Sequence, residues 1–276
     1  MYYNLTSRKE EKLNMKVKIL GISGSPRHAN TEFIVKEALA SAEELPDVET
    51  EYYSLAGKKL NGCIMCAKCH DPEATQDNPC PPFPDDVVAL SRKMVKSDGM
   101  IIGTPVYVGA ASAQLKMVFD RISSFIEHGP FGHQALRNKV VGAVTSAWDR
   151  EGGHCMAIMD IIKYSILMDM IVVGSGPERL KTVCYWGGAV IESYHADKPE
   201  PFWEGVGTPE EKTAVKYDKL GLGSVRRLGK RVAEMAKVVK AGFEVLPREQ
   251  TYWPHGPLAP DFYKEAHFRW AKTEKP

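Results

Sequence analysis

Short apolar segments alternate with amphipathic ones along most of the chain. Four runs rich in β-branched and other apolar residues have the pattern of buried strands: 17–23, 99–104, 139–145 and 170–174. Residues 48–55 alternate polar and apolar positions and are predicted to form a further strand. Apolar residues recur at helical spacing in four other segments and in a long final one: 32–44, 85–96, 112–126, 155–168 and 217–241.

The regular order of strand and helix predicts the fold class. Strands that alternate with helices at this interval form βαβ units around a parallel sheet. We therefore expect an α/β protein with one doubly wound, five-stranded parallel sheet and helices on both faces, built from residues 16–245. Residues 1–15 are an N-terminal lead and residues 246–276 a C-terminal tail. Residues 175–208 and the tail from 246 exceed the basic unit, and the polar segment at 56–84 is an insertion within it.

Composition and charge indicate which classes of partner to expect and in which cellular compartment the protein works. The formal net charge is +1 and the basic residues are scattered, so we expect no nucleic-acid partner. No run reaches the roughly 18 consecutive apolar residues of a membrane span, and the N-terminus lacks the apolar region of a secretory signal. We expect a cytoplasmic protein with no membrane partner. Thiols are kept reduced there, which disfavours disulfides.

The turn after the first predicted strand, GSPRHANT, carries hydroxyl, amide and guanidinium groups at the start of a helix. Backbone N–H groups at a helix N-terminus are unpaired and carry partial positive charge, so this position stabilises a phosphate. The turn lacks both the closely spaced glycines of a dinucleotide fingerprint and the Gly-Lys-Ser/Thr ending of a P-loop. It predicts a site for a single terminal phosphate. The alternative is an ordinary turn in which Asn30 or Thr31 caps the helix.

Four of the six cysteines lie within eighteen residues of the insertion: Cys63, Cys66, Cys69 and Cys80. C-x-x-C-x-x-C with a remote fourth cysteine is the arrangement that wraps a chain around a cubane cluster, with one thiolate on each iron. A long irregular segment inside a compact domain is usually functional. The four cysteines are therefore predicted to ligate a [4Fe–4S] cluster.

Two other chemistries remain open for the same cysteines. His70 completes a Cys₃His set of the kind that holds structural zinc, and a C-x-x-C pair can also act as a redox dithiol. Ten residues separate Cys69 from Cys80, so His70 is a second candidate for the fourth cluster ligand. The remaining cysteines, Cys155 and Cys184, lie in apolar surroundings and are predicted to be buried structural thiols.

Three motifs in this order carry a resemblance to a known family: GISGSPR…NT, the cysteine cluster, and TPVYVGAASAQLKMVFDR at 104–121. The chain resembles the flavodoxin-like NAD(P)H-dependent FMN reductases and, because of its cysteines, is most similar to the iron–sulfur flavoproteins. The resemblance covers roughly residues 16–175 and the last helix. It implies a flavodoxin-like fold with FMN as a cofactor.

By position, the resemblance assigns three turns to FMN. The first turn would hold the phosphate through Ser23, Gly24, Ser25, Pro26, Arg27, Asn30 and Thr31. The turn after the third strand would hold the isoalloxazine ring through Pro105, Val106, Tyr107, Val108 and Gly109. A third flavin-facing loop, after the fourth strand, would contribute Ser146, Ala147, Trp148, Gly152 and Gly153. Tyr107 and Trp148 have a structural alternative, as loop aromatics that pack on the core.

The resemblance implies an FMN- and [4Fe–4S]-dependent oxidoreductase that couples a ferredoxin or NAD(P)H donor to a small-molecule acceptor. No general acid or base stands out, because flavin chemistry belongs to the cofactor. Two alternatives are an NAD(P)H:FMN or quinone reductase with structural zinc, and a non-catalytic redox sensor. The family also implies a homodimer or homotetramer, and the aromatic tail after residue 246 has the composition of a contact surface.

Overall fold

A computed structural model describes residues 16–126, 129–132, 134–149, 151–177, 184–192 and 212–246. Its sheet has the strand order β2-β1-β3-β5-β6, with β7 paired to β5 and β4 paired to β3. The strands are β1 Val17–Ser23, β2 Val48–Ser54, β3 Gly99–Tyr107, β4 Ala110–Ala111, β5 Val140–Ala147, β6 Ile171–Val172 and β7 Gly188–Ile191. All pairings are parallel except the short β3–β4 hairpin. The predicted doubly wound α/β fold is confirmed.

The strand count differs from the prediction because two short strands share one position. β6 pairs with the first half of β5, and β7 pairs with its second half, from Val144 to Ala147. The predicted strand 170–174 is therefore only the first piece, and the chain leaves the sheet after it. It returns at Gly188, within the segment that exceeded the basic unit. With the β4 hairpin, the described part of the chain has seven strands in place of five.

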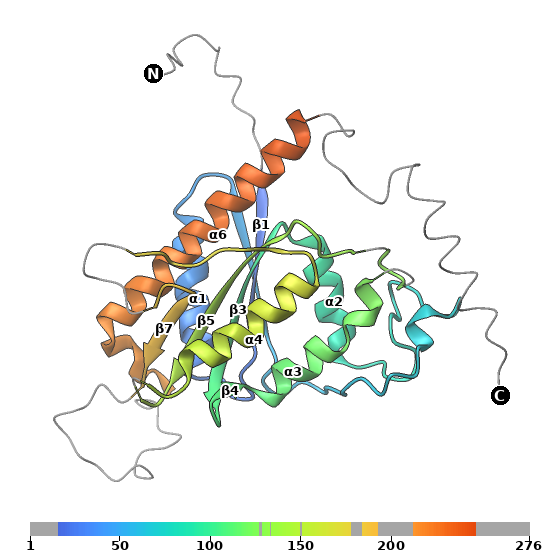
Figure 1. Ribbon diagram of the computed structural model, residues 1–276, viewed down its shortest axis with the longest axis horizontal. Coiled ribbons are helices and arrows are strands. Elements are labelled where there is room, and N and C mark those ends of the chain that lie inside the picture. Colours follow the sequence, from blue (N-terminus) through green and yellow to red (C-terminus); the bar gives the residue numbers. More distant parts are fainter. Residues whose placement is uncertain are drawn as a thin grey trace.

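The helices form one layer on each face of the sheet. Helices α1 Asn30–Glu43 and α6 Lys219–Val245 pack on one face, and α2 Asp86–Lys96, α3 Ala113–Asp120 and α4 His154–Leu167 on the other, as Figure 1 shows. Short 3₁₀ turns occupy Lys68–His70 (η1), Ile122–Phe125 (η2) and Ala214–Tyr217 (η3). No helix in the described ranges is long and apolar enough to cross a membrane.

The alternation of side chains along the central strands explains these two layers. In β3, Met100 and Ile102 point to the core beneath α2, α3 and α4, whereas Ile101 points to the core beneath α1 and α6. On the latter face a Cβ at Gly103 would lie 2.3 Å from Val35, and one at Gly229 of α6 would lie 2.0 Å from the Ala38 carbonyl oxygen. Glycine at these two positions lets α1 approach both the sheet and α6.

Polar side chains fix where three of the helices begin. Asp85 accepts a hydrogen bond from Val87 N at the start of α2, Ser112 accepts one from Leu115 N at α3, and Asp218 accepts one from Gly221 N at α6. Helix α3 ends at Asp120, six residues before the predicted end, and the chain continues through η2. The lead 1–15 and the tail from 247 lie outside the described residues.

Candidate cofactor sites

A cavity of about 270 Å³ lies at the carboxyl ends of β1, β3, β5 and β7. This edge of an open α/β sheet is where ligands bind. Its lining comprises twelve residues from the three predicted turns and the end of β7: Ser25, Arg27, Ala29, Asn30, Thr31, Pro105, Val106, Tyr107, Ser146, Ala147, Trp148 and Glu192. The structure thus brings together most of the residues predicted to bind FMN.

The β1–α1 turn presents donors to this cavity. Helix α1 begins at Asn30, its N-cap is Ala29, and no described side chain caps it. The alternative in which Asn30 or Thr31 serves as the N-cap is therefore wrong. Since uncapped N-terminal amides carry partial positive charge, this end of α1 can hold a phosphate. Ser25 Oγ accepts from Arg27 N at 3.1 Å, which bends the turn and sets Arg27 at the cavity wall. This donor set fits the phosphate of FMN.

Asn30 and Thr31 are buried, and each connects the turn to another part of the chain. Asn30 Oδ1 accepts from Val215 N at 3.2 Å, which attaches η3 to the start of α1. Thr31 Oγ1 lies 3.1 Å from Ser146 Oγ, at the end of β5. The first and third predicted FMN turns are therefore in direct contact.

The second turn is a two-residue hairpin between β3 and β4. Val108 and Gly109 both have positive φ, 51° and 75°, the combination that a type I′ hairpin turn requires. A β-branched residue such as Val108 rarely adopts this conformation, and its side chain is fully exposed. Gly153 has φ of 103°, and a Cβ there would lie 2.8 Å from Gly109 Cα. The backbones of the second and third turns therefore pack against each other.

Seven predicted FMN residues do not line the cavity: Ser23, Gly24, Pro26, Val108, Gly109, Gly152 and Gly153. Both backbone polar groups of Gly24 are already hydrogen-bonded within the protein. Its N–H donates to Gly103 O at 2.7 Å, and its carbonyl accepts from Ser112 Oγ. Two residues that line the cavity, Ala29 and Glu192, are not among those predicted from the sequence. Glu192 follows β7, a strand whose pattern was too short to predict, and its N–H donates to Ala147 O.

The cysteine-rich segment forms a second, smaller cavity of about 80 Å³. Its lining includes all four predicted ligands and the second candidate for the fourth: Cys63, Cys66, Cys69, Cys80 and His70. Met65 and Ala67 have positive φ, 54° and 58°, and these two reversals turn the chain around the cavity. The Met65 N–H donates to Cys63 Sγ at 3.3 Å. Hydrogen bonds to cysteine sulfur are one means by which proteins tune iron–sulfur clusters.

The thiols differ in exposure, and burial raises the pKa of two of them. Cys66 is exposed, while the other three are half-buried. Burial raises the pKa of Cys69, and the neighbouring thiols add to this effect. Burial also raises the pKa of Cys80, against the charge of Arg121, which lowers it. Outside the cavity Cys184 is buried as predicted, but Cys155 is exposed, so the prediction of a buried thiol there is wrong.

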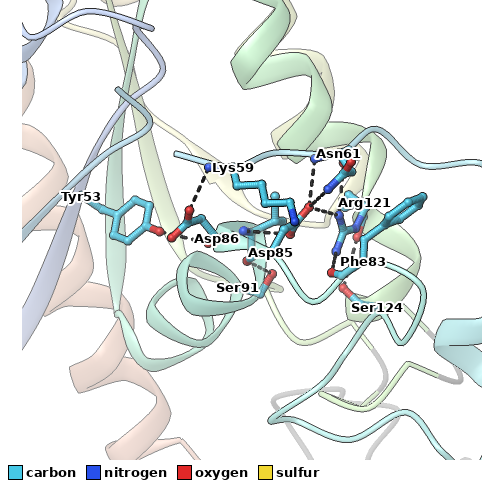
Figure 2. A network of polar contacts seen from close by, with 10 residues as sticks. Tyr53, Lys59, Asn61, Phe83, Asp85, Asp86, Ser91, Arg121 and Ser124 are labelled. Atoms are coloured by element: carbon cyan, nitrogen blue, oxygen red, sulfur yellow. Dashed lines mark hydrogen bonds and ion pairs between the residues drawn. The ribbon is translucent and has the colours of Figure 1, made fainter. Parts of the chain in front are cut away.

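A polar network closes the neck of the cysteine loop, which we define as residues 59–61 and 83–86. Lys59 N donates to Asp86 Oδ2 at 2.8 Å, and Asp86 N donates to Lys59 O. Arg121, from the end of α3, donates to Asn61 O and Asp85 Oδ2, both at 3.1 Å, as Figure 2 shows. Asp85 Oδ2 also accepts from the backbone and side-chain amides of Asn61. The segment that carries the cysteines is thus held at both ends.

The arrangement of the thiols bears on which metal they suit. Within the described residues, no three His, Cys, Asp or Glu side chains converge closely enough to hold one metal ion. Structural zinc needs four ligands at about 2.0–2.3 Å from a single centre. In a cubane cluster each thiolate binds a different iron, so the ligands surround a volume. Four cysteines line this one cavity, so their number and type fit the ligand set of a cubane cluster.

The two cavities have no lining residue in common. In Figure 1 the cysteine segment lies beside α2 and α3, whereas β7 lies on the opposite side of the sheet from it. Glu192, which follows β7, and Tyr107, at the end of β3, line the other cavity. The edge position of β2 explains this separation, since the chain leaves the sheet there directly into the insertion. A redox group in each cavity would be held by its own set of residues.

Comparison with known proteins decides the family. Residues 17–177 match the family described as NADPH-dependent FMN reductase. The chain belongs to this family. It is also 40% identical over 226 residues to an iron–sulfur flavoprotein of Methanocaldococcus jannaschii, a match that covers 81% of this chain and 100% of the relative. An iron–sulfur flavoprotein of Archaeoglobus fulgidus is 33% identical, over 79% of this chain and 96% of the relative.

These matches place the chain among the iron–sulfur flavoproteins of the FMN reductase family, a family of FMN-dependent oxidoreductases. The solved structure of RosB with bound 8-demethyl-8-formylriboflavin-5'-phosphate superposes with a TM-score of 0.56, at 15% identity, over 94% of this chain and 89% of that one. At this identity the likeness establishes the flavodoxin-like fold alone.

Proposed function

We propose that this protein binds FMN in the cavity at the carboxyl ends of the strands and a [4Fe–4S] cluster in the cysteine cavity. In this proposal it transfers electrons from a ferredoxin or NAD(P)H donor to a small-molecule acceptor. The observation that carries the proposal is the gathering of Cys63, Cys66, Cys69 and Cys80 around one cavity. Its neighbours by sequence are named iron–sulfur flavoproteins, which supports it further.

The residues of the first turn account for phosphate binding. The uncapped amides of α1 and the guanidinium of Arg27 supply positive charge at one end of the cavity. The buried hydroxyl groups of Thr31 and Ser146 also line the cavity, and this pair can donate a further hydrogen bond to FMN. A terminal phosphate is therefore held by backbone dipoles, hydroxyls and one cation.

The second and third turns account for ring binding. Pro105, Val106 and Tyr107 from the second turn, and Ala147 and Trp148 from the third, line the cavity. Tyr107 and Trp148 are both partly exposed, which fits aromatic side chains at the mouth of a flavin site better than residues packed wholly on the core. In this proposal these side chains would surround the ring, with the two aromatic residues nearest the solvent.

The bound cofactors supply the redox chemistry: a flavin exchanges one or two electrons, and a cluster exchanges one. The chain keeps the two groups apart, in cavities that share no lining residue. It also holds the cluster ligands on a segment closed at its neck by Asp85 and Arg121. This arrangement suits conversion between a two-electron and a one-electron partner. The cluster should lie within electron-transfer reach of an FMN, in the same subunit or in a neighbouring subunit of a homodimer or homotetramer.

A reductase with structural zinc is the second candidate. His70 lines the cysteine cavity and could complete a Cys₃His set. The donor set favours the cluster, because four cysteines line the cavity and each can bind one iron of a cubane. A redox sensor without turnover is distinguished by its failure to pass electrons from any donor.

Replacement of single cysteines tests the proposal. Cys66→Ala should abolish the broad visible absorbance of the cluster while FMN remains bound, because the two cavities share no residue. Cys155→Ala is the matched control, since Cys155 is also exposed but lies outside the cavity. Reduction of FMN by NAD(P)H should survive in Cys66→Ala, whereas electron exchange with one-electron partners, reduced ferredoxin among them, should fall. Stoichiometric zinc without iron in the native protein would support the second candidate.

A further inference from the structure

Arg121 brings a permanent positive charge to the wall of the cysteine cavity. Arg121 lines the cavity together with the four cysteines, and an arginine side chain is a fixed cation. Its side chain is 5% exposed, and that of its partner Asp85 is 1% exposed. Asp85 itself does not line the cavity. The cation therefore stands on the cavity wall, with its counter-charge set back from it.

Three acceptors fix the position of the guanidinium. Nη1 donates to Asn61 O and to Asp85 Oδ2, both at 3.1 Å, and Nη2 donates to Phe83 O at 3.3 Å. Figure 2 shows that these acceptors come from both sides of the loop neck, while Arg121 comes from the end of α3. The ring of Phe83, 5.7 Å from Arg121 Cζ, covers the guanidinium as well. A charge held so firmly cannot move away when the net charge inside the cavity changes.

We propose that Arg121 and Asp85 set the reduction potential of the cluster held by the four cysteines, Arg121 raising it and Asp85 lowering it. This inference rests on the proposed function. Reduction adds one negative charge to the cavity, and a fixed cation nearby stabilises that charge while a fixed anion opposes it. Burial reduces screening by water and salt, so both effects are larger than those of surface charges at the same distance.

A purely structural role for the pair makes a different prediction. Loss of either partner breaks the same ion pair and loosens the same neck. If only loop geometry governed the cluster, Arg121→Gln and Asp85→Asn would shift the potential in the same direction, or leave it unchanged. Opposite shifts require that the charges themselves act on the cluster.

The experiment is a potentiometric titration of the cluster, followed by electron paramagnetic resonance, in anaerobically purified full-length protein. We expect a more negative potential in Arg121→Gln, a more positive one in Asp85→Asn, and an intermediate value in the double variant. Lys68→Gln is the matched control for an exposed cation of the same loop, whose side chain is 56% exposed, and its shift should be the smallest.

Asp85→Asn carries the test even where Arg121→Gln fails to fold. Asparagine is as good an N-cap as aspartate, so α2 can keep its cap. Its amide nitrogen then faces the donors of Asn61 and Arg121, so the neck is loosened as in Arg121→Gln and only the sign of the shift separates charge from geometry. A negative shift or no shift in Asp85→Asn would overturn the inference. A native protein without iron and sulfide would instead contradict the proposed function, and the two failures are thus distinguishable.

Discussion

Thr31 Oγ1 and Ser146 Oγ lie 3.1 Å apart, although 115 residues separate them in the sequence. Both side chains are buried, and both line the cavity proposed for FMN. One belongs to the first turn of α1, and the other to the last residues of β5. This contact makes a single site from two turns that are predicted separately.

Thr31→Val tests that contact, because valine keeps the shape of threonine and removes the hydroxyl. Ser146 loses its partner, and we expect FMN binding to weaken by about 1–2 kcal/mol. Equilibrium titration followed by flavin fluorescence measures the change. Thr50→Val removes an exposed hydroxyl from β2 and should leave the affinity unchanged. Equal effects of the two substitutions would contradict a role for Thr31 at the site.

Arg27→Gln tests which end of the cavity holds the phosphate. The variant loses a charge-assisted hydrogen bond, so FMN affinity should fall by about 1.5–3 kcal/mol. Riboflavin has the same ring and ribityl chain but no phosphate, and its affinity should not change. A parallel loss for riboflavin would place Arg27 at the ring or show that it only supports the turn.

Parts of this architecture follow from local sequence, and other parts do not. The strand Val17–Ser23 is nearly all apolar, and the cysteines carry their spacing within one loop, so both are predictable. Strand β7 has only four residues and is recognisable only by its pairing with β5. The end of α3 at Asp120 carries no local stop signal. The Asp85–Arg121 pair joins residues 36 apart through the folded neck, which no periodicity reveals.

Gly153→Ala tests the packing of the second and third turns. At φ of 103° any side chain is strained, and a Cβ would also lie 2.8 Å from Gly109 Cα. We expect lower stability and FMN binding weakened by roughly 1–3 kcal/mol, the range of local backbone strain. Gly57→Ala is the matched control: its φ is 69°, but a Cβ there meets nothing within 4 Å. Thermal unfolding and FMN titration are measured for both variants. Gly57→Ala reports the effect of backbone strain alone, and Gly153→Ala reports strain together with the clash.

Lys139 predicts a pH dependence of stability. Its Nζ donates to Val95 O and Ser97 O, and burial lowers the pKa of the amine to about 8, helped by Lys240 and opposed by Asp98. Between pH 8 and 10.5 the unfolded chain binds more protons than the native one, so stability rises with pH in this window. From pH 8 to 9.5 the gain is on the order of 1–2 kcal/mol.

Denaturant unfolding of the native protein and of Lys139→Met at the two pH values isolates this contribution. The free energy of unfolding of the native protein should rise relative to the variant, although methionine also removes two hydrogen bonds at the end of α2. A constant difference between the two proteins would show that the amine keeps its ordinary pKa.

The most direct test of the whole account is the iron, acid-labile sulfide and FMN content of protein purified without oxygen. We predict about four iron and four sulfide per chain, as a [4Fe–4S] cluster requires, together with one FMN. The broad visible absorbance of the cluster should be lost in Cys63→Ala, Cys66→Ala and Cys69→Ala. It should also be lost in Cys80→Ala, unless His70 supplies the fourth ligand. One zinc per chain and no sulfide would contradict the central claim that the four cysteines hold an iron–sulfur cluster.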